Sequence, residues 1–169
     1  MTTTTSTLHS VLDATTDALT LNPAAGQKTV AATCDLVATC TVDVRLDDQT
    51  VTFDQASPIG DEAGPTPGQG LLAVLGACQA QVYRFWSQKL GIGFDTLRVE
   101  VRGDIDVRRL FGADEVVRPG FSNVAIDVHI SGPESPARYD ELRRAVNEHC
   151  PMLDVVSNPV SVSTATHAG

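Results

Sequence analysis

The sequence has no apolar run that approaches the roughly 18 residues of a membrane-spanning helix. Its N-terminus, MTTTTSTLHSV, has no basic region followed by an apolar stretch, so we expect no secretory signal. Positive charge is also scarce, because 21 acidic residues outnumber 12 basic ones and give a net charge of −9. Nucleic acid and membrane surfaces are therefore not expected as partners. No repeat or linker divides the 169 residues, a length that suits one domain.

The four cysteines form no CxxC motif and lack the spacing of metal ligands. We therefore expect neither a metal nor another cofactor. In the reducing cytoplasm that we expect for this chain, a cysteine pair is more often catalytic than structural. Cys34 and Cys40 lie in an apolar, Thr-rich segment, and we interpret them as small hydrophobic residues of the core or near the surface.

The central feature of the sequence is the apolar segment GPTPGQGLLAVLGACQAQVYRFWSQ, from Gly64 to Gln88. Apolar residues recur in it at spacings of three and four, which predicts one long helix with Cys78 near its middle. Thr66 can cap its start, Pro67 suits the first helical position and Gly91 can end it. Because apolar residues cover most of the circumference, we expect this helix to be buried on most sides.

Other segments predict a mixture of helices and strands. Helical periodicity predicts an amphipathic helix from Ser6 to Leu21, after a Thr-rich start at residues 1–5 that we expect to be disordered. Alternating apolar residues predict a hairpin within residues 29–53 and strands at Thr96–Val107, Phe121–Ile130 and Val160–Val162. We expect residues 1–29 to form an N-terminal extension and residues 30–169 to form the domain.

A second helix is predicted to open at Ser135 and Pro136. It is expected to end at His149 and Cys150, because a proline follows and disfavours helix at the residue before it. Residues 152–156 suit one further turn. The loop at residues 56–68, rich in proline, glycine and acid, leads into the Cys78 helix and is either a functional loop or a plain connector.

Cys78 in mid-helix and Cys150 at a helix end are the candidates for chemistry. Spacing alone leaves a redox pair and two inert buried thiols both open. A mid-helix cysteine receives no help from a helix N-terminus, so a thiolate at Cys78 would need a cation from another segment. The candidates are Arg45 on the hairpin, Arg118 in a charged loop, and Arg84, whose offset on the same helix points it away.

The segments GPTPGQGLLAVLGAC and EHCPMLDVVSNPV, with two alternating strands between them, resemble the OsmC/Ohr family of thiol peroxidases. In that family one helix carries a peroxidatic cysteine, and a helix end carries a resolving cysteine. The run from Arg118 to Phe121 is similar to the OsmC-like branch. The resemblance covers residues 30–165 and implies an α+β fold, with two long helices packed on curved antiparallel sheets in an intertwined homodimer. Such a dimer fits a helix that is apolar nearly all round.

The resemblance implies that Cys78 attacks the peroxide O–O bond, which gives a sulfenic acid and an alcohol. Cys150 would then form a disulfide with Cys78, and a small or lipoyl-type dithiol would reduce it. The apolar surroundings of Cys78 favour an organic hydroperoxide, fatty or aromatic, over hydrogen peroxide. We select Arg45 as the activating arginine, because it lies on the hairpin before the loop. Where the best-known members have a glutamate that orients this arginine, the sequence has Gly68, and Glu62 lies further upstream.

Two other functions stay open from the sequence. One is an OsmC-like dimer that binds a small apolar ligand and has no peroxidase activity. The other is a Cys–His hydrolase acylated on Cys78, for which the sequence offers no orienting group. His149 is either a catalytic neighbour of Cys150 or a helix-end histidine near carbonyl groups. The second thiol favours the peroxidase, since neither rival requires Cys150.

Overall fold

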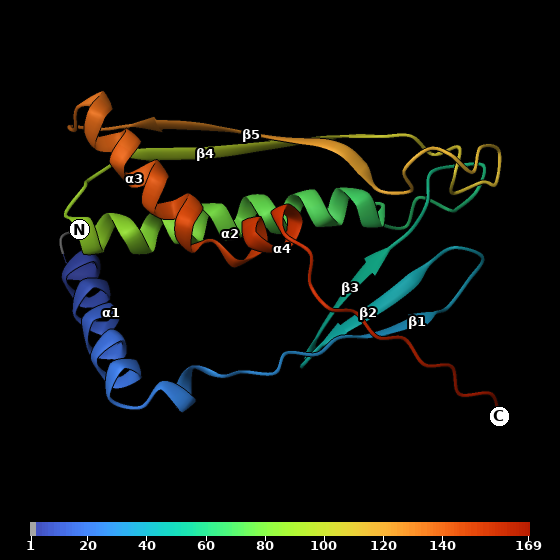
Figure 1. Cartoon of the computed structure of the whole chain (residues 1–169), viewed down its shortest axis with the longest axis horizontal. Helices are drawn as coiled ribbons and strands as arrows, with labels where there is room; N and C mark the ends of the chain where they lie inside the picture. The colour runs from blue at the N-terminus through green and yellow to red at the C-terminus, as the bar shows by residue number, and fades with distance from the viewer. Residues whose placement is uncertain (1–2) are drawn as a thin grey trace.

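The computed structural model describes residues 3–169, and their side chains from Leu8 onward. The chain has the α+β fold that the resemblance implies, with a long central helix, α2 (Pro67–Leu90), along which the other elements are arranged (Figure 1). A long ribbon of two strands lies along one side of α2, and α3 (Pro136–His149) crosses the helix between its middle and its C-terminal end (Figure 1). A short helix, α4 (Pro151–Ser157), follows α3 directly and also packs on α2.

The ends of α2 lie where the sequence predicts them. Thr66 Oγ1 accepts a hydrogen bond from the Gln69 N–H at 3.3 Å, and Gln69 Oε1 accepts one from the Thr66 N–H at 2.8 Å. This reciprocal pair satisfies two donors that the helix itself leaves free. At the other end Gly91 adopts φ 60°, in the left-handed region that commonly ends helices. The cap, the proline at the first position and the glycine stop are thereby confirmed.

Two antiparallel sheets flank the helix. One has three strands in the order β1 (Thr33–Leu36), β2 (Val42–Leu46) and β3 (Gln49–Phe53). The other has two, β4 (Thr96–Ile105) and β5 (Phe121–Ser131). The predicted hairpin and both later strands are confirmed. The prediction of a strand at Val160–Val162 is wrong, because these residues lie in an exposed tail that pairs with no strand of the described chain.

The N-terminal helix, α1 (Thr3–Leu21), confirms the predicted amphipathic helix and packs on α2. It begins earlier than expected, so the prediction of disorder is wrong for residues 3–5, and residues 1–2 lie outside the described residues. Threonine is compatible with this helix, because the hydroxyl can donate to the carbonyl four residues earlier. Thr15, Thr16 and Thr20 all do so, at 2.7–2.8 Å. A 3₁₀ turn, η1 (Pro23–Gly26), follows.

The hydrophobic core lies between α2, α3 and the start of α4. Its buried members are Val82, Tyr83, Ile92, Leu142, Val146 and Cys150. The expectation that α2 is buried on most sides is wrong within one chain. Among residues 3–169, the side chains of Leu71, Val74 and Phe85 remain 44%, 54% and 41% exposed. Within residues 3–169, every helix is too short or too polar to span a lipid bilayer.

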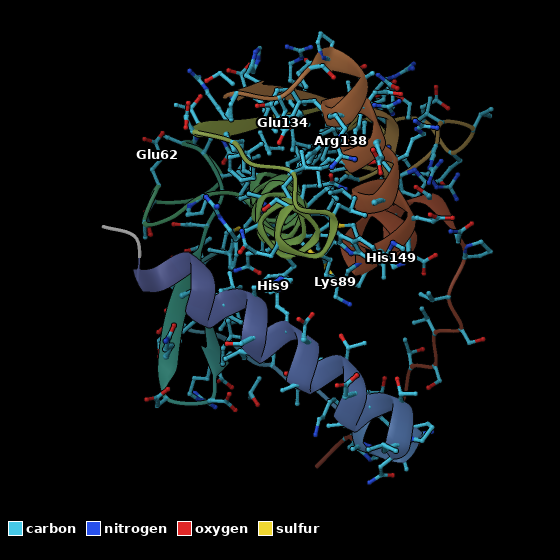
Figure 2. All side chains as sticks on the ribbon, turned by 90° about the vertical axis from the view of Figure 1, so that its left-hand side faces the viewer. His9, Glu62, Lys89, Glu134, Arg138 and His149 are labelled. Carbon is cyan, nitrogen blue, oxygen red and sulfur yellow. The ribbon has the colours of Figure 1, made fainter. Side chains whose placement is uncertain are left out.

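Polar contacts at the C-terminal end of α2 fix α3 against it. Arg138 Nη2 donates to the Leu90 carbonyl oxygen at 3.0 Å, and Glu134 Oε1 accepts from the Gly93 N–H at 3.3 Å. Figure 2 shows both side chains together at the start of α3. These contacts hold the start of α3 at the C-terminal end of α2. The length of α3 then determines which part of α2 its last residue reaches.

Candidate active site

Cys78 and Cys150 lie side by side, with their Sγ atoms 3.6 Å apart. Cys78 projects from the middle of α2, and Cys150 occupies the junction where α3 ends and α4 begins. Cys150 is 2% exposed and Cys78 is half-buried, so a molecule from solvent meets Cys78 first. A disulfide needs an S–S distance of about 2.05 Å, so a relative movement of roughly 1.5 Å would join the sulfurs.

The junction at Cys150 has a local cause in the sequence. Pro151 disfavours helical geometry at the residue before it, and Cys150 adopts φ −85° and ψ 110°. The chain therefore leaves α3 at this residue and restarts as α4, with the thiol placed against α2. The helix end and the further turn were both predicted from the sequence and are confirmed.

The environment of Cys78 favours the protonated thiol. Burial raises the pKa of Cys78, and the thiol of Cys150 raises it further. The backbone N–H of Met152 donates to the sulfur and opposes this rise. The expectation that Cys78 receives no help from a helix N-terminus is thus incomplete, since Met152 lies in the first turn of α4. No local signal indicated this contact, because the two segments are distant in sequence.

Within the described chain, no cation acts on the Cys78 thiol. Arg45 is exposed on β2, where its Nη1 lies 2.5 Å from Asp35 Oδ2 on β1. The guanidinium of Arg84 lies 4.3 Å from the centre of the Phe94 ring, so it is engaged elsewhere, as its offset predicted. Arg118 lines a separate cavity. One chain therefore unites the two thiols without Arg45, whose role stays a prediction.

No carboxylate that could orient the activating arginine is found at Gly68 or at Glu62. Gly68 has no side chain to supply one, and the Glu62 carboxylate is engaged elsewhere. A Cβ atom at Gly68 would lie 3.5 Å from the Phe121 ring, so an aromatic side chain already packs against this position. Glu62 adopts φ 58°, and its Oε1 accepts from the Ser57 N–H at 3.2 Å. Its carboxylate is thereby used within its own loop.

His149 holds the end of α3 against α2. Its Nδ1–H donates to the Ala145 carbonyl oxygen at 2.7 Å, and its ring lies 4.0 Å from the Trp86 ring, centre to centre. Figure 2 labels this side chain at the end of α3. These contacts favour the helix-end interpretation of His149 over a catalytic one, and they leave the hydrolase hypothesis without a base directed at Cys78.

Two cavities have residues of both α2 and α4 in their walls. One, of about 460 Å³, lies between the β1–β3 sheet, α2 and α4, and has Cys34 and Met152 in its wall. The other, of about 480 Å³, lies between α4, α2 and the start of β5. Cys34 is exposed, Cys40 is half-buried, and all four cysteines are free. No cluster of metal-ligating side chains occurs within residues 3–169.

Gln79, which follows Cys78, is a buried polar residue that sequence patterns did not single out. It is 0% exposed, and neither its amide nitrogen nor its carbonyl oxygen has a hydrogen-bond partner in the part of the chain that the structure describes. An unpaired buried group costs about 1–3 kcal/mol. We therefore expect Gln79→Met, which keeps the side-chain length, to raise the free energy of unfolding by about 2 kcal/mol. The measurement is thermal unfolding, with a rise in Tm of about 4–8 °C.

The control for this substitution is Gln81→Met, since Gln81 is exposed on the same helix. It should leave Tm nearly unchanged. A fall in Tm for Gln79→Met would show that the amide is paired in solution.

A family model described as OsmC-like protein matches residues 60–165, which is more than half of the chain and includes both thiols. The chain belongs to the OsmC-like family. The resemblance stated from the segments around Cys78 and Cys150 is thereby confirmed. Among curated protein sequences, none matches this OsmC-like chain.

Solved structures share the OsmC-like fold. An OsmC like protein from Mycoplasma pneumoniae superimposes with a TM-score of 0.68 at 19% identity, over 78% of this chain and 89% of that chain. An organic hydroperoxide resistance protein from Legionella pneumophila gives 0.58 at 20% identity, over 76% and 89%. OhrB of Bacillus subtilis, another organic hydroperoxide resistance protein, gives 0.52 at 19% identity, over 76% and 90%. At these identities the likeness shows the fold.

Proposed function

We propose that this OsmC-like chain is a cysteine-based peroxidase that reduces organic hydroperoxides to alcohols, in defence against oxidative stress. The observation that carries the proposal is the 3.6 Å distance between the Sγ atoms of Cys78 and Cys150. Two free thiols this close can cycle between dithiol and disulfide. The Legionella and Bacillus structures with the same fold are organic hydroperoxide resistance proteins, which supports the proposal.

The proposed reaction has three steps. The Cys78 thiolate attacks one peroxide oxygen, the O–O bond breaks, and the leaving alkoxide takes a proton to become the alcohol. The thiol of Cys150 then attacks the resulting Cys78 sulfenic acid, and water leaves as the disulfide forms. An external dithiol, small or of lipoyl type, finally attacks the disulfide and is itself oxidised, which restores both thiols. We place this cycle in a reducing cytoplasm.

The active assembly is proposed to be a homodimer in which Arg45 of the second copy reaches Cys78. Burial raises the pKa of Cys78 and the Cys150 thiol raises it further, so a thiolate nucleophile needs a positive charge that residues 3–169 of its own chain do not bring. The exposed apolar face of α2, with Leu71, Val74 and Phe85, gives the second copy a surface to cover. Arg45 is itself exposed on β2, where a second copy can meet it.

The test is intact-mass measurement and peptide mapping of the reduced protein after one equivalent of cumene hydroperoxide or, separately, of hydrogen peroxide. We expect the loss of two hydrogens, mapped to Cys78–Cys150, to appear faster with the organic peroxide. Cys34→Ser should behave as the unmodified protein does. Thiols that stay free, or a disulfide that uses Cys34 or Cys40, would contradict the assignment of Cys78 and Cys150 as the redox pair.

A further inference from the structure

Cys150 lies at a break between two helices, where the backbone does little to fix the thiol. This residue has extended geometry, with φ −85° and ψ 110°, and Pro151 after it has no backbone N–H to donate. The hydrogen-bond ladder of α3 therefore does not continue through the junction into α4. The 3.6 Å distance from Cys150 to Cys78 depends instead on the contacts that neighbouring residues make with α2.

Such contacts exist on both sides of Cys150. On the C-terminal side, the backbone N–H of Met152 donates to the Cys78 sulfur, so this contact involves an atom that reacts. On the N-terminal side, the ring centre of His149 lies 4.0 Å from that of Trp86, with the ring planes inclined by 37°. The ring contact involves neither sulfur. It is therefore available to hold the junction in each redox state of the two thiols.

Both rings in this contact are restricted by their surroundings. The Trp86 side chain is partly buried and packs against the hydrophobic core, and the Lys89 ammonium lies 5.3 Å from the centre of its ring. The His149 ring is tied to its own helix, because Nδ1–H donates to the Ala145 carbonyl oxygen at 2.7 Å. Side chains that are already restricted lose little conformational entropy on pairing, which suits this contact to an anchor.

We propose that His149 is a positioning residue, whose ring anchors the α3–α4 junction on Trp86 and thereby holds Cys150 within reach of Cys78. Polar contacts already fix the start of α3 to the C-terminal end of α2, so His149 fixes the end that carries the thiol. Holding two reacting groups in place raises their effective concentration. The use of this positioning in hydroperoxide reduction rests on the proposed function, whereas the positioning itself does not.

The test is the thiol–disulfide equilibrium of the full-length protein with glutathione, in a background with Cys34→Ser and Cys40→Ser. Glutathione disulfide oxidises the Cys78–Cys150 dithiol to the disulfide and is itself reduced to two glutathione thiols. The fractions of the two protein forms, measured by intact mass after an acid quench, give the effective concentration of the thiol pair. We expect His149→Ala to lower this effective concentration about two- to tenfold, the effect of losing one aromatic pair.

Further variants separate the ring contact from the hydrogen bond of His149. His149→Phe keeps a ring against Trp86 and should retain most of the effective concentration. His149→Gln keeps a side-chain donor without the ring and should lose as much as His149→Ala. Glu148→Ala is the matched control, because Glu148 is exposed in the same turn of α3, and it should have no effect. In a Trp86→Leu background, His149→Ala should cause little further loss, because its ring partner is already absent.

An unchanged equilibrium for His149→Ala would overturn the assignment, as would a His149→Phe variant that loses as much as His149→Ala. A purely structural role would lower Tm and leave the glutathione equilibrium unchanged, so thermal unfolding of each variant is measured beside it. Absence of the disulfide in the parent would overturn the assignment as well. No peroxide is present. A parent that forms the disulfide with glutathione but not with cumene hydroperoxide would therefore contradict the peroxidase and leave the positioning intact.

Discussion

Replacing Cys78 with serine is expected to lower the rate of organic hydroperoxide reduction by on the order of 10³-fold or more. The serine hydroxyl has almost the same shape as the thiol, so the fold should persist. A hydroxyl without a base beside it is a weak nucleophile, and the described contacts of Cys78 include no base. The measurement is the steady-state loss of cumene hydroperoxide with a dithiol as reductant.

Cys150→Ser separates the two thiol roles. We expect this variant to complete one reduction per site and then stop, because the Cys78 sulfenic acid has no thiol 3.6 Å away to resolve it. A reagent selective for sulfenic acids, such as dimedone, should then label Cys78. Cys34→Ser is the control and should turn over normally. Normal multiple turnover by Cys150→Ser would contradict the assignment of Cys150 as the resolving thiol.

The positions of both thiols in the fold were predictable from the sequence, because nearby residues mark where the helix that carries each thiol begins or ends. Thr66, Pro67 and Gln69 define where α2 begins, which places Cys78 in mid-helix. Pro151 defines where α3 ends, which places Cys150 at a junction. These signals act through the backbone of a few neighbouring residues, and tertiary packing did not change the helix ends that they predict.

No local sequence signal predicted the long-range contacts at the site. The donation from the Met152 N–H to Cys78 depends on how α4 lies against α2, which no periodicity specifies. The burial of Gln79 depends on the same packing. A glutamine within an apolar helix suggests an exposed position, yet packing has enclosed it without a partner. The strand predicted at Val160–Val162 does not form. Alternating apolar residues form a strand only where another strand offers an edge to pair with, and the sequence pattern does not specify such an edge.

The apolar circumference of α2 was read correctly from the sequence, but its burial was not. Val74 and Phe85 are among the apolar side chains of α2 that are exposed in a single chain. Hydrophobic patterning specifies that a face is suited to burial, and it does not specify whether the cover comes from the same chain. This face and the missing cation beside Cys78 have one common explanation in the proposed second copy.

That explanation makes Arg45 the second substitution with a large expected effect. In the isolated chain, burial raises the pKa of Cys78, so the thiol is protonated at neutral pH and becomes nucleophilic only as the pH rises. A guanidinium within about 4–6 Å would lower that pKa by about 1–3 units. We therefore expect Arg45→Gln to shift the pH profile of Cys78 alkylation upward by about 1–3 pH units. The rate at neutral pH would fall about 10- to 1000-fold, because each unit changes the thiolate fraction tenfold.

The measurement is the rate of iodoacetamide alkylation between neutral and alkaline pH. It uses a background in which Cys34, Cys40 and Cys150 are serine, so that Cys78 alone reacts. Arg98→Gln is the matched control, because Arg98 is likewise an exposed strand arginine that pairs with a carboxylate, that of Glu100. Its profile should coincide with that of the parent. If the Arg45→Gln profile also coincides with that of the parent, the cation comes from elsewhere, and the same experiment on Arg118→Gln tests the other arginine that the sequence offered as a candidate.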